Sequence, residues 1–273
     1  MRKLTPGRVI GGIVLVIMLA FSLLPMYLMF ATSTKTTTQF ATDIWGIAWP
    51  PHWDNYVIAW NGIKHYVWNT LKCSAMTVLF STTVALLAGY SFAKMRFKGK
   101  ETLYMIIMAF RMVPGTLLLI PNFLMAYRMG LYNTHLGVVL PGLASVSFMP
   151  MILIINHFKT IPDELFEAAR IDGATEWGVI KNLLIPLGKP IILTCMLFTF
   201  FGTIGTYTWP LLILRDDGLK TIGIGLQAFA GEYGVNYGVQ MAAYSIVSGA
   251  LMILVGLTMK TYVNGITAGA VKG

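Results

Sequence analysis

Six stretches of predominantly apolar residues, separated by more polar segments, divide the chain. A helix needs roughly 20 apolar residues to cross the hydrocarbon core of a bilayer, and each stretch reaches that length. The pattern predicts an all-α integral membrane protein in which one domain, residues 1–273, carries six transmembrane helices. The expected spans are residues 9–30, 68–92, 103–127, 136–157, 190–214 and 241–262.

Composition agrees with this interpretation, because 56% of the residues are hydrophobic and 11% are charged. The mean hydropathy of +0.69 lies outside the range of soluble domains. Cys73 and Cys195 both fall within apolar stretches, so neither a disulfide nor a thiolate metal site is predicted. The net charge of +9 does not indicate nucleic acid binding, since no basic stretch alternates with aromatic residues.

The positive charge instead indicates how the chain is oriented in the membrane. With a cytoplasmic N-terminus, 13 of the 20 Lys and Arg residues fall in cytoplasmic segments and six fall in outer segments. The positive-inside rule then places both termini in the cytoplasm. A cleaved signal peptide is the alternative for the first stretch, but its apolar part exceeds the roughly 7 to 15 residues of a signal core. We therefore expect a permanent first helix.

The outer segment 31–67 is rich in aromatic residues that could either stack on sugar rings or form an interfacial belt. The belt is the more common role of Trp and Tyr at a membrane surface, and we favour it. Pro50-Pro51 breaks any helix there, so short pieces along the outer surface are expected. The aromatic residues are Trp45, Trp49, Trp53, Tyr56, Trp60 and Tyr66.

The cytoplasmic loop 158–189 is far more polar than its surroundings and predicts a helix-turn-helix. Thr160 is the expected N-cap of a first helix from Pro162 to Ile171, with acidic residues in its first turn. Gly173 is expected to end this helix in the left-handed conformation.

Thr175 is the expected N-cap of a second helix in this loop, which carries Trp177. Pro186 and Pro190 are expected to interrupt this second helix before the chain re-enters the membrane.

The same loop resembles the signature loop of the permease subunits of binding-protein-dependent ABC importers. The resemblance rests on Glu167-Ala168-Ala169, then Gly173 after three residues, then Leu183-Leu184-Ile185-Pro186 after nine more. Similar motifs along the chain point to the carbohydrate-importing, maltose-type branch. They include Trp49-Pro50, Asn69-Thr70-Leu71, the residues from Phe92 to Lys100, Met112-Val113-Pro114-Gly115, Trp209-Pro210 and the residues from Gly265 to Gly273.

This resemblance implies the type I ABC importer permease fold in a bacterial-type inner membrane, and half of the translocation pathway of an ATP-driven saccharide importer. The implied partners are a second homologous permease, two ATP-binding subunits, an extracytoplasmic solute-binding protein and membrane lipid. The ATPase-coupling residues would be Glu167, Ala168, Ala169, Asp172 and Gly173.

The resemblance also implies that the outer loop 215–240 touches the binding protein. The contact would lie within residues 222–237, including Gln227, Glu232 and Tyr233. The chain has no phosphate-binding Gly-x4-Gly-Lys-Ser/Thr pattern, so we expect a non-catalytic subunit whose partner binds ATP and Mg²⁺.

The chain departs from the family pattern in the fifth predicted span. A Trp-Asn-Asp or Trp-Asn-Glu triplet is common there, whereas this chain has Ile204-Gly205-Thr206 before Tyr207 and Trp209. Tyr207 and Trp209 are candidate cavity residues, although packing near the outer interface is the more common role.

Arg111 is the only charged residue in the middle of a predicted span, about 16 Å along a helix that begins near Lys100, whereas Lys72 and Lys260 lie near the ends of theirs. None of the 11 carboxylates lies inside a span. Arg111 is therefore either a hydrated structural residue or a contact for an acidic solute. A glycerol phosphodiester or another anionic solute is thus the alternative substrate.

A membrane enzyme and an ion channel are the remote alternatives. The first lacks clustered titratable groups, because His52, His65 and His135 fall in outer segments and His157 ends a span. The second lacks a visible filter segment.

Overall fold

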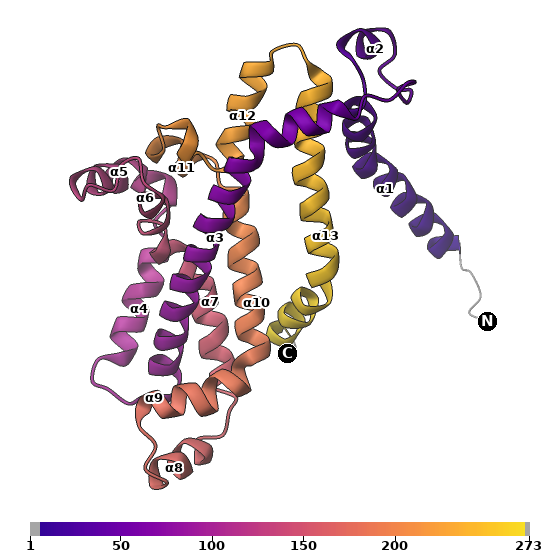
Figure 1. Cartoon of the computed structure of the whole chain (residues 1–273). Coiled ribbons are helices and arrows are strands. Elements are labelled where there is room, and N and C mark those ends of the chain that lie inside the picture. The colour runs from indigo at the N-terminus through magenta and orange to yellow at the C-terminus, as the bar shows by residue number, and fades with distance from the viewer. Residues whose placement is uncertain (1–5, 271–273) are drawn as a thin grey trace. The chain divides into compact units, whose positions relative to one another are not determined.

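The computed structural model describes residues 6–270, and that part of the chain is helical with no strand (Figure 1). Besides α-helices it contains three short helical segments of other types. They are the 3-10 helices Gly115–Leu118 and Asp217–Leu219 and the π-helix Ile180–Leu184. The α-helices are α1 Pro6–Ser33, α2 Thr37–Thr42, α3 Asp54–Lys94, α4 Lys100–Arg111, α5 Leu119–Arg128, α6 His135–Val139, α7 Leu143–Phe158, α8 Glu164–Ile171, α9 Glu176–Val179, α10 Ile185–Ile204, α11 Thr208–Ile213, α12 Ile222–Tyr233 and α13 Tyr237–Ala270.

Four helical stretches are long and apolar enough to cross a membrane among the described residues, or five if a bent pair counts as one span. The four are Val9–Ser33, Asp54–Lys94, Glu176–Ile204 and Tyr237–Lys260. They correspond to the first, second, fifth and sixth predicted spans. The fold is thus all-helical as predicted, whereas the third and fourth predicted spans are not single helices.

The prediction of one continuous helix over residues 103–127 was wrong. The helix α4 ends at Arg111, and the segment Gly115–Arg128 continues at an angle of 88° to it. Pro114 explains the bend, because it lacks a backbone N–H and disfavours helical geometry at the residue before it. Arg111 therefore lies at the end of a helix.

The predicted span 136–157 is divided in a similar way. The short α6 ends at Val139, and α7 begins only at Leu143 after a turn that contains Pro141 and Gly142. With 16 residues, α7 is shorter than a typical spanning helix.

The fifth span begins earlier than predicted, because α9, the π-turn and α10 form one continuous helical stretch through Pro186 and Pro190. The prediction that these prolines interrupt the helix was wrong. Pro186 stands in the first turn of α10, directly after the wider π-turn, where its ring is tolerated. The hydroxyl of Thr194 donates to the carbonyl oxygen of Pro190 over 2.9 Å within the same helix.

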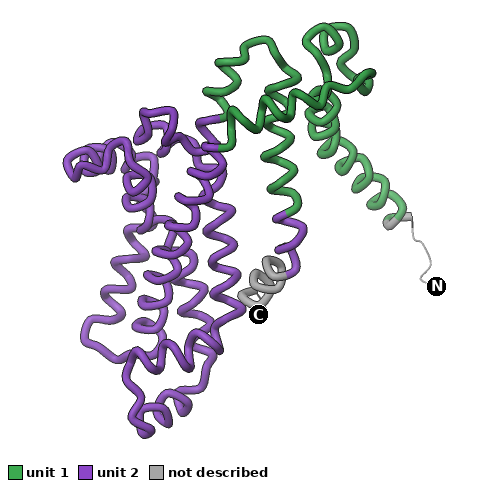
Figure 2. The backbone as a smooth tube through the Cα atoms, in the orientation of Figure 1, with its two compact units in different colours: residues 1–64, 226–253 green, residues 65–225, 254–273 purple. Residues whose placement is uncertain are grey.

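The chain divides into two compact units, which are described separately (Figure 2). Unit 1 comprises residues 1–64 and 226–253, and unit 2 comprises residues 65–225 and 254–273. In unit 1 the Lys35 side chain is almost fully buried, and its ammonium donates to the carbonyl oxygens of Asp43 and Ile44. This contact orders the segment after α1, in which Trp49 is 89% exposed.

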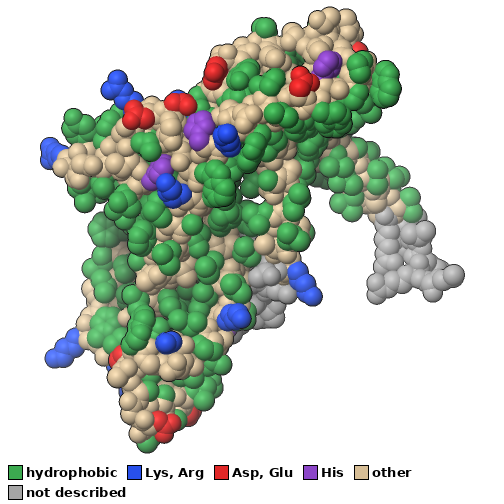
Figure 3. Space-filling view, viewed as in Figure 1, with side chains coloured by type: hydrophobic (Ala, Val, Ile, Leu, Met, Phe, Trp, Pro, Cys, Tyr) green, Lys and Arg blue, Asp and Glu red, His purple; other side chains and the backbone are tan. Residues whose placement is uncertain are grey.

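The core of unit 2 is formed where α3, α7, α8 and α10 pack together. Gly89 of α3 permits the closest approach, because a Cβ atom at this position would lie 2.4 Å from Cγ2 of Ile154 in α7. On the face shown in Figure 3, uncharged and largely hydrophobic side chains cover the middle of unit 2, and Lys and Arg lie toward its ends. This distribution is typical of a protein that crosses a membrane.

Candidate functional site

The polar loop between α7 and α10 has an ordered first helix, α8, but this helix does not begin as predicted. Asp163 occupies the N-cap position and makes no side-chain capping hydrogen bond, and the first helical residue is Glu164. The hydroxyl of Thr160 instead donates to the carbonyl oxygen of His157 over 2.7 Å. The prediction of Thr160 as N-cap and of Pro162 as the first helical residue was therefore wrong.

The end of α8 confirms the predicted conformation of Gly173, whose φ is +78°. The N–H of Gly173 donates to the carbonyl oxygen of Arg170 over 3.0 Å, and the N–H of Ala174 donates to that of Ala169 over 2.9 Å. These two bonds form a Schellman motif, which pairs carbonyl groups that a helix end otherwise leaves free. The chain consequently leaves α8 in one defined direction.

The second helix of the loop begins at the predicted residue. The hydroxyl of Thr175 accepts a hydrogen bond of 3.1 Å from the N–H of Gly178, as expected of an N-cap. Only the two residues Ala174 and Thr175 separate Gly173 from α9, so little free chain remains between α8 and the long helical stretch that follows.

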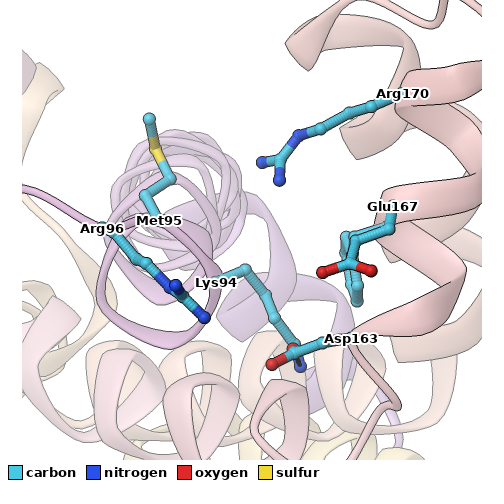
Figure 4. Close-up of a pocket in the computed structure, with 7 residues that line it drawn as sticks. Lys94, Met95, Arg96, Asp163, Glu167 and Arg170 are labelled. Carbon is cyan, nitrogen blue, oxygen red and sulfur yellow. Dashed lines mark hydrogen bonds and ion pairs between the residues drawn. The ribbon is translucent and has the colours of Figure 1, made fainter.

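Lys94, the last residue of α3, holds the beginning of α8 in place (Figure 4). Its ammonium donates to the carbonyl oxygen of Ile161 and to Oδ1 of Asp163, each over 2.5 Å, and lies 4.9 Å from the ring centroid of Phe166. The Lys94 side chain is only 5% exposed. We call these contacts of Lys94 with Ile161, Asp163 and Phe166 the α3–α8 clamp.

The electrostatics of the α3–α8 clamp favour the charged form of Asp163. The hydrogen bond and charge of Lys94 lower the pKa of Asp163, so this carboxylate stays ionised at neutral pH. Three acceptors surround the ammonium: a carboxylate, a carbonyl and an aromatic face, which together compensate for its burial. Losing Lys94 would leave the carbonyl of Ile161 without this donor.

A second contact connects α3 with the other end of α8. The hydroxyl of Tyr90 donates to the carboxylate of Glu176, and Oε1 of Glu176 lies 3.4 Å from Nη2 of Arg170. Tyr90 lies one helical turn before Lys94, so the end of α3 contacts the loop both before and after α8. A pocket of about 380 Å³ lies at this junction, and Figure 4 shows Glu167 and Arg170 beside it.

The five residues predicted to couple to an ATPase lie together at α8 and its C-terminus. Glu167, Ala168, Asp172 and Gly173 are exposed, while Ala169 is half-buried against the core of unit 2. Sequence reasoning missed the residues that hold them, namely Tyr90, Lys94, Phe166 and Glu176. The motif from Phe92 to Lys100 contained a signal for Lys94, but its partner lies 69 residues further along the chain.

Beside the clamped face, this loop exposes three large apolar side chains. Leu165 is 44% exposed, Ile171 is 86% exposed and Trp177 is 66% exposed. Phe166, between the first two, is 3% exposed and packs into the core of unit 2. One face of the loop thus packs against the rest of unit 2. Its other face carries apolar side chains that are exposed.

The candidate cavity residues Tyr207 and Trp209 differ in their surroundings. The indole N–H of Trp209 donates to the carbonyl oxygen of Gly137 over 3.1 Å, and its ring packs against a cluster that includes Ile213. Trp209 therefore has a packing role. Tyr207 precedes α11 and is 38% exposed.

Arg111 is exposed at the end of α4, and its guanidinium carbon lies 5.5 Å from the ring centroid of Phe148 in α7. Among the described residues no carboxylate lies within 4 Å of it, so its charge is not neutralised by an ion pair there. The 88° bend that follows leaves this cation beside a helix end. This cation–π contact with Phe148 does not use the hydrogen-bond donors of the guanidinium.

The predicted outer contact region, residues 222–237, consists of α12 and the turn after it. Gln227 and Glu232 are exposed, whereas Tyr233 packs against Phe229 with ring centroids 4.5 Å apart. The 3-10 helix Asp217–Leu219 precedes α12 and belongs to unit 2. The hydroxyl of Tyr66 donates to the carboxylate of Asp217 there and lies 2.9 Å from both of its oxygens.

No group of three or more His, Cys, Asp or Glu side chains among the described residues is arranged to hold a metal ion.

Comparisons with known proteins identify the family of the chain. Residues 81–267 match the family described as binding-protein-dependent transport system inner membrane component. The chain is 30% identical over 250 residues to the probable ABC transporter permease protein YurM of Bacillus subtilis, covering 91% of this chain and 83% of that protein. It is also 30% identical over 262 residues to the maltose/maltodextrin transport system permease protein MalG of Escherichia coli, covering 89% of this chain and 86% of that protein.

The fold is likewise similar to that of a solved structure. A chain of a bacterial ABC transporter involved in the import of the acidic polysaccharide alginate superposes with a TM-score of 0.80 at 22% identity, covering 96% of this chain and 99% of that chain. The family match extends from within α3 to within α13 and includes the whole clamped loop. The chain therefore belongs to the family of inner membrane components of binding-protein-dependent transport systems.

Proposed function

We propose that the chain forms half of the translocation pathway of an ATP-driven saccharide importer and couples to a separate ATPase through the loop 158–189. The observation that carries the coupling proposal is the ordered α8, whose end is fixed by Gly173 and whose beginning is held by Lys94. The similarity to a maltose/maltodextrin permease supports a saccharide as the solute. A second homologous permease, two ATP-binding subunits and an extracytoplasmic binding protein complete the proposed complex.

The coupling residues Glu167, Ala168, Ala169, Asp172 and Gly173 present the exposed part of α8 to the ATPase in this proposal. The uncovered side chains of Leu165 and Ile171 supply apolar contact area for docking. Because the α3–α8 clamp fixes α8 to the end of α3, a displacement of α8 by the ATPase would move α3 as well. A flexible loop would absorb the same displacement.

Arg111 supports a second proposal, that the solute is anionic. Arg111 carries an unneutralised charge beside a bend, and the planar guanidinium can hold a carboxylate or phosphate through two parallel hydrogen bonds. An anionic solute, such as a uronic oligosaccharide or a glycerol phosphodiester, is therefore the second candidate. Tyr207 remains a candidate for contact with either kind of solute.

Topology gives the first test. We propose six spans with both termini cytoplasmic, in which the bent α4–α5 segment forms the third span and α6–α7 the fourth. Reporter fusions after Tyr56 and within residues 215–240 should then report an outer location, and fusions at Gly99 and Gly173 a cytoplasmic one. A cytoplasmic signal from residues 215–240 would contradict the six-span arrangement.

Gly173 gives the direct test of coupling. Gly173→Val places a β-branched residue at φ +78° and should cost about 1–2 kcal/mol locally, which displaces the end of α8. Gly173→Asn is the matched control, because Asn accepts this conformation far better. We expect Gly173→Val to reduce maltodextrin uptake in proteoliposomes at least tenfold or to uncouple ATP hydrolysis from uptake, and Gly173→Asn to retain most uptake. Full uptake by Gly173→Val would remove the basis of the coupling proposal.

Lys94 tests whether the clamp transmits the displacement. Lys94→Met keeps much of the side-chain volume but removes the donors for Ile161 and Asp163. The expected result is a complex that assembles and hydrolyses ATP but imports severalfold less solute per ATP. Lys98→Met is the control, since Lys98 is exposed and has no ion pair among the described residues. Equal import per ATP in both variants would show that the clamp has no part in coupling.

Arg111 tests the charge of the solute. If Arg111 contacts an anion, Arg111→Gln should slow uptake of a uronic oligosaccharide about tenfold more than uptake of a neutral oligosaccharide of the same length. Arg111→Lys should restore uptake only in part, because an ammonium lacks the planar fork. Unchanged uptake of the uronic oligosaccharide by an assembled Arg111→Gln complex would instead identify a structural residue.

A further inference from the structure

A second pocket, separate from the one beside the α3–α8 clamp, lies where α4 begins and α7 ends. It has a volume of about 510 Å³, within the usual range of small-molecule sites. Lys100, the first residue of α4, and Lys159, the residue after α7, both line it. No residue proposed for coupling or for solute contact lines this pocket.

The two lysines give this pocket an excess of positive charge. Lys100 donates to the carbonyl oxygen of Met95 over 3.0 Å, which leaves its charge uncompensated. Lys159 is exposed, and neither lysine forms an ion pair within the described part of the chain. Glu101 also lines the pocket and is its only carboxylate, so the pocket carries a net positive charge.

The backbone adds to this positive potential. The helix α4 has 12 residues, and its N-cap residue, Gly99, makes no side-chain capping hydrogen bond. The first N–H groups of α4 are therefore not satisfied by a capping side chain, and they lie at the positive end of the helix dipole. The positive end of this helix dipole would stabilise an anionic group held near Lys100.

Apart from Glu101, the other residues that line the pocket are aromatic or aliphatic. The ring of Tyr104 packs edge-on against Phe92 with centroids 5.6 Å apart, and Ile155 behind them is 1% exposed. Met105 follows, about 7 Å along α4 from Lys100 and 62% exposed. The pocket thus changes from cationic at the helix ends to aromatic and then aliphatic along α4.

This order of groups matches an anionic glycerophospholipid. A phosphate group would lie between two lysines at the level of the helix ends, where basic pockets between spanning helices bind anionic headgroups. The glycerol would lie against the tyrosine, which favours the interface between headgroups and hydrocarbon, and an acyl chain would follow Met105. A soluble phosphate would use only the cationic part of the pocket.

We propose that the pocket lined by Lys100, Tyr104, Met105 and Lys159 is a binding site for the headgroup and first acyl segment of an anionic phospholipid. The proposal requires that the chain crosses the membrane, as its family does, but it depends on neither the solute nor the ATPase. A failed coupling test would therefore leave it unaffected.

Native mass spectrometry of the full chain in detergent tests the site, with dioleoyl phosphatidylglycerol and dioleoyl phosphatidylcholine as probes. We expect the chain to retain phosphatidylglycerol in preference to phosphatidylcholine. The double variant Lys100→Gln/Lys159→Gln should weaken phosphatidylglycerol binding by about fivefold for each lysine, or roughly 25-fold in total. Lys100→Arg/Lys159→Arg keeps both charges and should retain binding.

The matched control is Lys181→Gln/Lys189→Gln, which removes two exposed lysines of the neighbouring helical stretch and changes the net charge equally. This control should bind phosphatidylglycerol as the unmodified chain does. Equal losses in both double variants would indicate only general attraction to the basic surface and would overturn the proposal. Equal binding of the two lipids, no loss in Lys100→Gln/Lys159→Gln, or displacement of phosphatidylglycerol by soluble glycerol 3-phosphate would also overturn it.

Discussion

The constraint on which this structure depends is that a backbone within a bilayer must satisfy its own hydrogen-bonding groups. It explains why the regular structure of the described chain is helical and why threonine hydroxyls within α3 and α10 donate to carbonyl oxygens of the preceding turn. The bends meet the same requirement locally. After α4 the N–H of Met112 donates to the carbonyl oxygen of Ala109 and that of Val113 to Phe110, and before α7 the N–H of Leu143 donates to Leu140.

Outside the membrane the same requirement is met by capping, and there the sequence was a good guide. Gly173 and Thr175 were both predicted correctly, because a left-handed helix end and a hydroxyl N-cap depend on residues within a few positions of each other. The start of α8 was predicted incorrectly, since the carboxylate of Asp163 is held by Lys94 and does not cap its own helix. A contact that is distant in the sequence therefore overrode a local preference.

The larger errors concerned long apolar stretches, and they have a common cause. Hydropathy reports how much apolar surface a segment carries, but it does not report the direction of the chain. The residues from 103 to 127 are apolar enough for one span, yet Pro114 turns them by 88°. The opposite error occurred at Pro186 and Pro190, which were predicted to interrupt a helix but lie within a continuous one. The difference is one of position: Pro186 stands in a first helical turn after a π-turn, whereas Pro114 follows a helix end.

The π-turn at Ile180–Leu184 has a mechanical consequence for the helical stretch that contains it. A turn with one additional residue is wider than the α-turns on either side, and such turns inside α-helices are often found at functional sites. In Figure 1 the helical stretch changes direction near this turn, so that α9 lies across the end of α10. A displacement of α9 would therefore reach the membrane-spanning part of α10 through these five residues.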